Sequence, residues 1–238
     1  SNLSNISSHN IFNGFFEDKN ISKIYNQFGA FDVITANNVF AHNRDLNKFI
    51  RNMSYLLKED GLISIEVQYL PKLINNCYID MIYHEHTSYH HFKPLNKLFK
   101  ECSLTLNSVS DIPTHGGSMR IILNNSSDNM ILFENKDKTK NFLKLDNIFD
   151  RQILNKFEIL KSKVENIKFS LNKSIRMLTE KYPFLYGYSA PAKTVTLLSL
   201  LDKDIINEIQ FSENMALFFV EIIDKNGSRF GFTWMVEK

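Results

Sequence analysis

The most unusual segment of the sequence is Tyr83–His91, which reads YHEHTSYHH. Four of the chain's seven histidines fall within eight positions there, beside one carboxylate, Glu85, and two tyrosines. A histidine has an unperturbed pKa of about 6.5, so it can take up or release a proton near neutral pH. A neighbouring carboxylate can orient the imidazole and raise its basicity. We therefore interpret this segment first as an acid–base centre.

Two other interpretations of the same segment stay open. It can be a surface loop in which histidines cluster by chance. It can also be a metal site, because His86 and His90 would lie one turn apart on a helix and His84 alternates with His86. That spacing matches no zinc signature, so the acid–base interpretation is favoured and no metal is predicted. A metal-dependent sugar isomerase would be the function of the metal alternative.

A second candidate is the loop ANNVFAH over Ala36–His42, directly after the apolar run Phe31–Ala36. A loop at the end of a buried strand can approach a ligand with its backbone, and Asn and His side chains supply directed hydrogen bonds. An asparagine after a strand is also a common turn former, and His42 can simply cap a helix.

A third candidate is THGGSMR over Thr114–Arg120. Paired glycines, of which Gly117 is the second, let the backbone come close to a ligand, and Arg120 can face an anion. The same pattern is typical of a hairpin turn followed by a solvated arginine.

A fourth candidate is GYSAPAK over Gly187–Lys193, a strand-to-helix turn with small residues and a lysine. Such turns offer backbone amides and a helix N-terminus to phosphate. The spacing is not that of a P-loop. Ser189 and Lys193 are therefore candidates for contact with a phosphorylated ligand.

The elements around these candidates predict an α/β fold. Phe31–Ala36 is expected to be a buried strand, Asp45–Leu57 an amphipathic helix with Asp45 as its N-cap, and Leu62–Val67 a second strand. This order implies a parallel crossover and a sheet covered by helices. Such sheets bind ligands beyond the carboxyl ends of their strands, and Tyr83–His91 follows the strand that ends at Val67.

Further elements complete the expected organisation. The patterns predict a strand at Ile11–Phe16 and a helix at Ile21–Phe28. An irregular segment over Gln68–Phe92 is followed by a helix at Lys93–Glu101. An edge hairpin is predicted from Leu104–Val109 and Ser118–Leu123. A long helix at Asn135–Tyr182 and a strand at Phe184–Tyr188 then follow. The last predicted elements are a helix at Thr194–Leu201 and a strand at Leu217–Ile223. We place the boundary in the polar break near residue 126, with domains at 1–126 and 127–238.

Composition limits the partners and the compartment. The 28 basic residues are spread along the chain and the formal charge is +2, so no nucleic-acid surface is indicated. No apolar run is long enough for a membrane span. Two cysteines, Cys77 and Cys102, form no disulfide framework. We expect a cytoplasmic protein that binds neither nucleic acid nor membrane.

Taken in this order, the motifs resemble the nucleotide-linked deoxysugar C-methyltransferases over roughly residues 10–200. The segments that carry the likeness are Asp32–His42, Glu66–Leu70, Ile82–His86, His115–Arg120 and Gly187–Lys193. The resemblance implies S-adenosylmethionine as the cofactor and methyl transfer to the carbon next to the ketone of a nucleotide-diphosphate keto-deoxysugar. It also implies a class I methyltransferase (Rossmann-like) sheet plus a smaller C-terminal α/β domain that holds the sugar nucleotide.

The family also implies roles for single residues. His86 is the favoured base, with Tyr83 and Glu85 close to the sugar, and Asn38 and His42 border the methyl donor. We expect Glu85 to orient or polarise the neighbouring imidazole. The residues expected to contact the substrate are His84, Tyr89, Gly117, Arg120, Ser189 and Lys193.

Parts of the family pattern have no counterpart in this sequence. They are its cysteine-rich zinc domain, the glycine-rich first strand–loop–helix of the methyltransferase fold and the continuation beyond Asn226. The resemblance therefore implies a member truncated at both ends, whose domains are partial. We expect such a chain to oligomerise or aggregate through the exposed edge of Phe31–Ala36 and to bind the donor weakly. The alternative function is a catalytically inactive sugar-nucleotide-binding or scaffold fragment.

Overall fold

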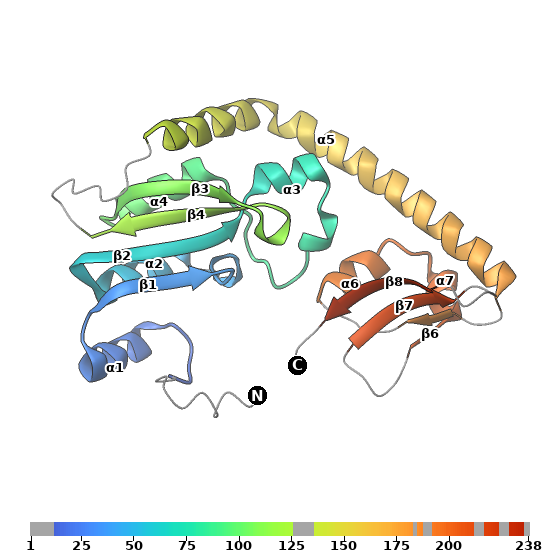
Figure 1. Cartoon of the computed structure of the whole chain (residues 1–238), viewed down its shortest axis with the longest axis horizontal. Helices are drawn as coiled ribbons and strands as arrows, with labels where there is room; N and C mark the ends of the chain where they lie inside the picture. The colour runs from blue at the N-terminus through green and yellow to red at the C-terminus, as the bar shows by residue number, and fades with distance from the viewer. Residues whose placement is uncertain are drawn as a thin grey trace. The chain divides into compact units, whose positions relative to one another are not determined.

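The structure is a computed structural model that describes residues 12–125, 136–182, 185–187, 192–211, 217–223 and 229–235 (Figure 1). The described chain forms two compact units of α/β type. The first unit holds the chain up to Val67 with Phe92–Ile112 and Ser118–Leu143, and the second holds Gln68–His91, Pro113–Gly117 and the chain from Lys144. Within the described ranges, no helix is both long and apolar enough to cross a membrane.

The first unit is built on a four-stranded sheet with the order β1-β2-β4-β3. β1 (Phe31–Asn37) and β2 (Leu57–Gln68) pair in parallel, and helix α2 (Leu46–Leu56) connects them in the chain. β3 (Thr105–Ile112) and β4 (Ser118–Asn124) pair antiparallel. The predicted parallel crossover and the predicted antiparallel hairpin are therefore both confirmed.

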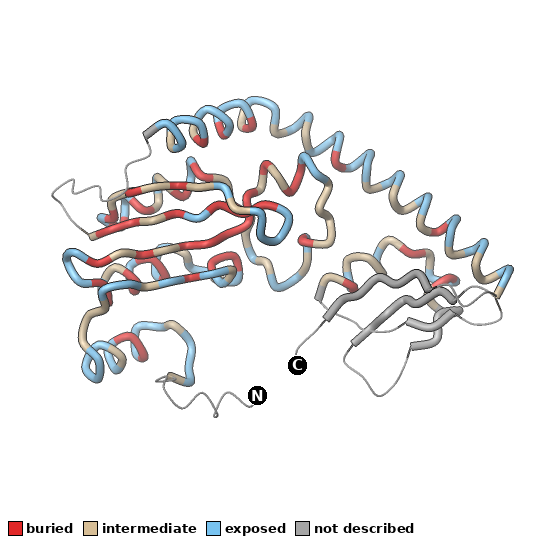
Figure 2. Tube along the Cα trace, in the orientation of Figure 1, coloured by how far each residue is buried: buried red, intermediate tan, exposed pale blue. Residues whose placement is uncertain are grey.

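The core of the first unit lies on the central strands β2 and β4, which are drawn mostly in red in Figure 2. Because successive side chains of a strand point to opposite faces, alternate residues are buried together. The fully or almost fully buried apolar residues of the two strands are Ile63, Ile65, Val67, Met119, Ile121 and Leu123.

Helices complete the first unit. α1 (Asp18–Phe28) packs against α2, and α4 (Phe92–Glu101) packs against β3. The predicted N-cap of α2 is confirmed, because the Asp45 carboxylate accepts a hydrogen bond from the backbone N–H of Lys48 at 2.9 Å. The helix buries one apolar face, which includes Phe49, Ile50 and Met53.

The second unit contains helices α3 (Leu70–Asn76), α6 (Ala192–Leu198) and α7 (Lys203–Glu208), and most of the 46-residue helix α5 (Lys136–Lys181). Its sheet has the order β6-β5-β7-β8, with bounds Ile209–Phe211, Leu185–Gly187, Leu217–Ile223 and Arg229–Met235. Short 3₁₀ turns, η3 (Ile79–Met81) and η4 (Thr114–Gly116), belong to the same unit.

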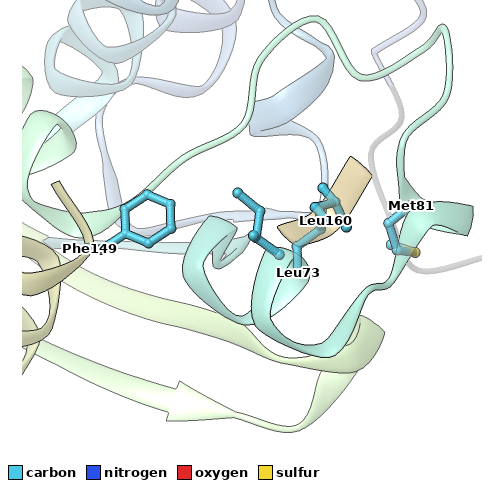
Figure 3. Close-up of a cluster of buried hydrophobic side chains, with 5 residues drawn as sticks. Leu73, Met81, Phe149 and Leu160 are labelled. Carbon is cyan, nitrogen blue, oxygen red and sulfur yellow. The ribbon is translucent and has the colours of Figure 1, made fainter. Parts of the chain in front are cut away.

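A compact apolar cluster joins α5 to the chain that follows β2. Leu73 and Ile74 of α3, Met81 of η3 and Phe149 and Leu160 of α5 are all buried in it (Figure 3). The two α5 residues are 11 positions apart, which corresponds to about three helical turns and places them on one face. One face of α5 therefore supports the segment that contains the candidate acid–base centre.

Some predicted elements differ from the structure. Residues 12–16 form no strand, so the strand predicted at Ile11–Phe16 is wrong for the described part, while Ile11 lies outside it. The segment after Gln68 is not irregular throughout, because α3 begins at Leu70 with Pro71 in its first turn, where proline is tolerated. The predicted boundary near residue 126 lies outside the described residues and stays a prediction.

Candidate active site

The candidate segment begins and ends at one place in the second unit. Tyr69 and His90 form a parallel β-bridge, and the N–H of Leu70 donates to the carbonyl of His90 at 2.7 Å. The N–H of Tyr69 also donates to the carbonyl of Gly117 at 3.2 Å. The chain from Tyr69 to His90 is therefore a loop closed at its base by backbone hydrogen bonds.

His86 is half-buried within this loop, and its ring contacts the backbone. Its Nδ1 lies 3.0 Å from the carbonyl oxygen of Met81. A carbonyl oxygen only accepts hydrogen bonds, so Nδ1 must carry the proton in this contact. In the neutral imidazole the basic lone pair is then on Nε2, which is the tautomer of a base that acts through Nε2.

Two half-buried tyrosines pack against His86. The ring of Tyr83 lies with its centroid 4.2 Å from that of His86, and the ring of Tyr89 lies 5.9 Å away in an edge-on arrangement. Burial raises the pKa of both hydroxyls, and for Tyr83 the negative charge of Glu85 raises it further. Both tyrosines therefore stay neutral hydrogen-bond donors at physiological pH.

The two charged or titratable neighbours in the YHEH motif are more exposed. His84 and Glu85 both lie at the surface, with the His84 ring 6.5 Å from that of Tyr83. The Met81 carbonyl is one acceptor that orients the His86 ring, and the predicted orienting role of Glu85 stays a prediction. After burial, the negative charge of Glu85 is the next cause of the raised pKa of the Tyr83 hydroxyl.

His90 has a different environment from His86. It is 7% exposed, and its Nε2 lies 2.9 Å from the hydroxyl of Ser88. Burial, with smaller contributions from His91 and His86, lowers the pKa of His90 to about 4. His90 is therefore neutral at physiological pH and serves as part of the closed base of the loop.

Lys193 lies beside this loop, at the start of α6. Its ammonium group is 3.4 Å from the carboxylate of Asp80, and the Thr196 hydroxyl donates to the carbonyl of Ile82. Thr194, the next residue after Lys193, is buried, and its hydroxyl oxygen has no hydrogen-bond partner within the described residues. Ser189, the other candidate of this motif, lies outside the described residues.

The glycines of the HGG turn pack against protein side chains. A side chain at Gly116 would meet the ring of Tyr78 at 2.8 Å, and one at Gly117 would meet Lys72 at 2.5 Å. Both glycines have positive φ angles, which other residues rarely adopt. Gly117 thus has a structural role in this turn, in addition to accepting the hydrogen bond from Tyr69.

The first unit carries the other group of candidates. Asn38 is half-buried with a φ of 54°, and its N–H donates to the Glu66 carbonyl at 2.9 Å. His42 ends the 3₁₀ turn η2 (Phe40–His42) and is exposed. Arg120, between buried Met119 and Ile121, donates to the buried carboxylate of Glu66 at 2.9 Å.

The sequence interpretation missed two residues near the loop that the structure brings to attention. Asp146 of α5 is fully buried and accepts a hydrogen bond from the hydroxyl of Tyr69 at 2.6 Å. Its signal in the sequence is a carboxylate on the same helical face as Phe142, Phe149 and Ile153. Asp80, the partner of Lys193, has no comparable sequence signal. In the described part of the chain, no three His, Cys, Asp or Glu side chains are grouped to hold a metal.

Comparisons with known families give two matches that follow one another along the chain. Residues 4–109 match a family described as "Methyltransferase domain", and residues 113–210 match "C-methyltransferase C-terminal domain". Together with the observed sheets, the first match confirms the predicted α/β methyltransferase fold class and supports S-adenosylmethionine as the methyl donor.

Among curated proteins, the chain is similar to the C-methyltransferase NovU of Streptomyces niveus. The two are 35% identical over 97 residues, which is 41% of this chain and 23% of the relative. The chain thus covers about a quarter of the length of that relative.

Two solved structures from Burkholderia thailandensis are also similar. One is a 1,6-didemethyltoxoflavin-N1-methyltransferase with bound S-adenosylhomocysteine, at 17% identity and a TM-score of 0.32, covering 41% of this chain and 44% of that one. The other is an O-methyltransferase family protein, at 18% identity and a TM-score of 0.37, covering 50% of this chain and 36% of that one.

Proposed function

We propose that the chain acts as a C-methyltransferase on a nucleotide-diphosphate keto-deoxysugar. The successive matches to a methyltransferase domain and to a C-methyltransferase C-terminal domain support this proposal. The methyl group comes from S-adenosylmethionine and is added to the carbon next to the ketone. The similarity to NovU, a C-methyltransferase, favours transfer to carbon. The methyltransferase match does not favour the alternative of a fragment that only binds sugar nucleotide.

The loop after β1 offers suitable chemistry for one side of the methyl donor. It carries the side-chain amide of Asn38 and the exposed imidazole of His42, both of which donate and accept hydrogen bonds. The Asn38 backbone is fixed on the neighbouring strand by its bond to Glu66. When bound, S-adenosylmethionine supplies an electrophilic methyl group on a positively charged sulfur.

In the proposed mechanism, His86 removes the proton from the carbon next to the ketone. The observation that carries this assignment is the Nδ1 contact with the Met81 carbonyl, which leaves the basic lone pair on Nε2. Proton transfer by a positioned histidine contributes on the order of 10²–10⁴-fold to a rate. After the transfer His86 is an imidazolium whose Nδ1 proton still bonds to the same carbonyl.

Removing that proton moves negative charge onto the ketone oxygen of the sugar. We assign the stabilisation of this charge to the neutral hydroxyls of Tyr83 and Tyr89, or to the His84 imidazole. The raised pKa values of the two tyrosines keep their protons in place at physiological pH. A preorganised donor at such an oxyanion is worth about 3 kcal/mol.

We assign Lys193 to the diphosphate of the sugar nucleotide. Its pairing with Asp80 holds the lysine side chain beside the loop that contains His86. A diphosphate carries more negative charge than one carboxylate, so it can compete with Asp80 for the ammonium group.

Deuterium exchange at the sugar tests the proton-abstraction step separately from methyl transfer. The chain is incubated in D₂O with a nucleotide-diphosphate 4-keto-6-deoxysugar without S-adenosylmethionine, and deuterium at the carbon next to the ketone is followed by NMR. We expect exchange with the wild-type chain and its loss in His86→Gln. His42→Gln is the control, because His42 is an exposed histidine of the loop after β1 and this experiment contains no methyl donor.

Adding S-[methyl-¹³C]adenosylmethionine to the same mixture then tests transfer. A labelled methyl group attached to a sugar carbon supports the proposed function. Binding of the sugar nucleotide without exchange or transfer would support the binding-only alternative. The proposed sugar class would be wrong if other ketones exchange and this one does not. The cytoplasmic location stays a prediction.

A further inference from the structure

Asp146 is a buried charged residue that the proposed mechanism does not use. Its exposed fraction is 0%, although carboxylates are almost never fully buried unless they are paired. It lies on the face of α5 that also carries Phe149, Ile153 and Leu160, which contact the segment after β2. A carboxylate in that position is costly to bury unless its hydrogen bonds are made.

Asp146 accepts a hydrogen bond from the start of the His86 loop and lies near the residue just past the end of that loop. The hydroxyl of Tyr69, at the start of the loop, donates to Oδ1 at 2.6 Å. The Nδ1 of His91, just past the loop, lies 3.9 Å from Oδ2, which is beyond hydrogen-bond distance, and its Nε2 lies 3.6 Å from Asp150 one helical turn further along α5. Hydrogen bonds to an ionised acceptor are roughly twice as strong as neutral ones.

The hydrogen bond between Asp146 and Tyr69 is connected to His86 through the backbone of the loop. Tyr69 and His91 flank the backbone pairing of Leu70 with His90, which closes the loop. Within the loop, His86 contacts the carbonyl of Met81, and the Met81 side chain belongs to the same buried cluster as Phe149 and Leu160 of α5. The base of the loop and the acceptor for His86 are thus both fixed to one face of one helix.

We propose that Asp146 is a positioning residue for the proton-transfer step, acting through Tyr69 on the loop that holds His86. This inference rests on the proposed function, in which His86 is the base. Asp146 keeps the loop closed at its base, so that the His86 imidazole meets the substrate carbon in the reactive geometry. Displacement of a catalytic group by about 1 Å can cost on the order of 10²-fold in rate.

Two variants separate positioning from a general loss of stability. Tyr69→Phe removes only the hydroxyl that bonds to Asp146, and Asp146→Ala removes the carboxylate. Glu158→Gln is the matched control, because Glu158 is an exposed carboxylate on the same helix. We expect kcat to fall by about 10-fold in Tyr69→Phe and further in Asp146→Ala, with KM for the sugar nucleotide within about 2-fold of wild type. Glu158→Gln should change neither parameter.

Hydrogen–deuterium exchange of the backbone amides gives a readout that does not depend on turnover. We expect faster exchange in residues 70–90 of Tyr69→Phe, and unchanged exchange in β2, β4 and the centre of α5. Unchanged exchange in residues 70–90 would overturn the proposal, as would an unchanged kcat or equal losses in kcat and substrate affinity. If the wild-type chain itself transfers no methyl group, the proposed function fails, and the exchange measurement still decides whether Asp146 holds the loop. If Asp146→Ala does not fold, Tyr69→Phe alone gives the decision.

Discussion

The two loops that follow the parallel strands β1 and β2 are built in different ways. The loop after β1 is short: the Asn38 N–H bonds to Glu66, the Asn43 side chain bonds to the carbonyl of Val39, and His42 at its end is exposed. The loop from Tyr69 to His90 is much longer and is fixed at its base, at Asn75 and at Met81. It is the longer loop that carries the proposed base.

This difference follows from what each loop has to do. A short loop next to a strand is restrained by the strand itself, so few additional contacts are needed. A long loop has a larger conformational entropy to lose, and it adopts one geometry only if tertiary contacts compensate for that loss. Helix α5 supplies such contacts through Asp146, Phe149 and Leu160, and Lys156 adds a hydrogen bond to Asn75 at 2.7 Å. Chemistry that needs a fixed imidazole is therefore expected on the supported loop.

The largest effect is expected from removing the imidazole on the long loop. His86→Ala should lower kcat for methyl transfer by about 10²-fold, because a positioned general base is lost. The affinity for the sugar nucleotide should persist, as measured by titration calorimetry. His42→Ala, in the short loop, should leave kcat within about 10-fold of wild type. This variant should instead weaken the binding of S-adenosylhomocysteine. Near wild-type turnover in His86→Ala would refute the assignment of the base.

The short loop is bonded to Glu66 through the Asn38 N–H, and the side chain of Glu66 is in turn paired with Arg120. Arg120→Met removes the guanidinium that lies 2.9 Å from the buried Glu66 carboxylate. We expect the free energy of unfolding to fall by about 2 kcal/mol, the usual range for a hydrogen bond to a charged group. The double variant Glu66→Gln with Arg120→Met should recover part of this loss in urea unfolding. A stable Arg120→Met variant with weakened sugar-nucleotide binding would instead favour the predicted role of Arg120 in substrate contact.

Lys193 tests whether the support of the long loop extends to substrate binding. Lys193→Ala should weaken binding of the nucleotide-diphosphate sugar by about 10-fold, since one charge-assisted contact to phosphate is lost. Binding of S-adenosylhomocysteine should be almost unchanged. Lys203→Ala, at an exposed lysine of α7, is the control. Equal weakening of both ligands by Lys193→Ala would indicate a folding defect and contradict the phosphate role.

Local patterns predicted the first sheet well. Apolar, β-branched segments marked β1, β2, β3 and β4, and Asp45 marked the start of α2, because these signals depend on neighbours within a few positions. The prediction that Phe31–Ala36 is buried is wrong, because only Ala36 of that strand is buried. The strand predicted at Ile11–Phe16 shows the limit of the method: an aromatic run of that length is compatible with several structures. Residues 12–16 instead form an irregular lead into α1, and Phe16 packs its ring on Phe49 at 5.1 Å.

The candidate site was predictable only in part. The YHEH motif identified His86 and Tyr83, which the structure brings into ring contact at 4.2 Å. The orienting carbonyl of Met81 and the carboxylate of Asp146 were not predicted. A backbone carbonyl has no residue type, and Asp146 is separated from Tyr69 by 77 positions, so no local pattern connects them. Gly117 also has a structural reason to be glycine, its φ of 121°, and the sequence alone does not distinguish that reason from ligand approach.

The smallest effect is expected on the pH dependence of stability, through the buried His90 at the closed base of the long loop. Its pKa is lowered to about 4 by burial, from 6.5, so between these pH values the unfolded chain binds a proton that the folded chain does not. The stability of the fold therefore rises with pH across this range and is lost as the pH falls from about 6.5 towards 4. At pH 5.5 the loss from this one group is about 1 kcal/mol relative to pH 7.5. Urea unfolding at the two pH values should show this loss in the wild type and in His42→Gln, and less of it in His90→Gln. The same pH dependence in all three proteins would mean that His90 takes up its proton in the folded chain as readily as in the unfolded chain. The closed base of the long loop would then be open to water, as the short loop after β1 is.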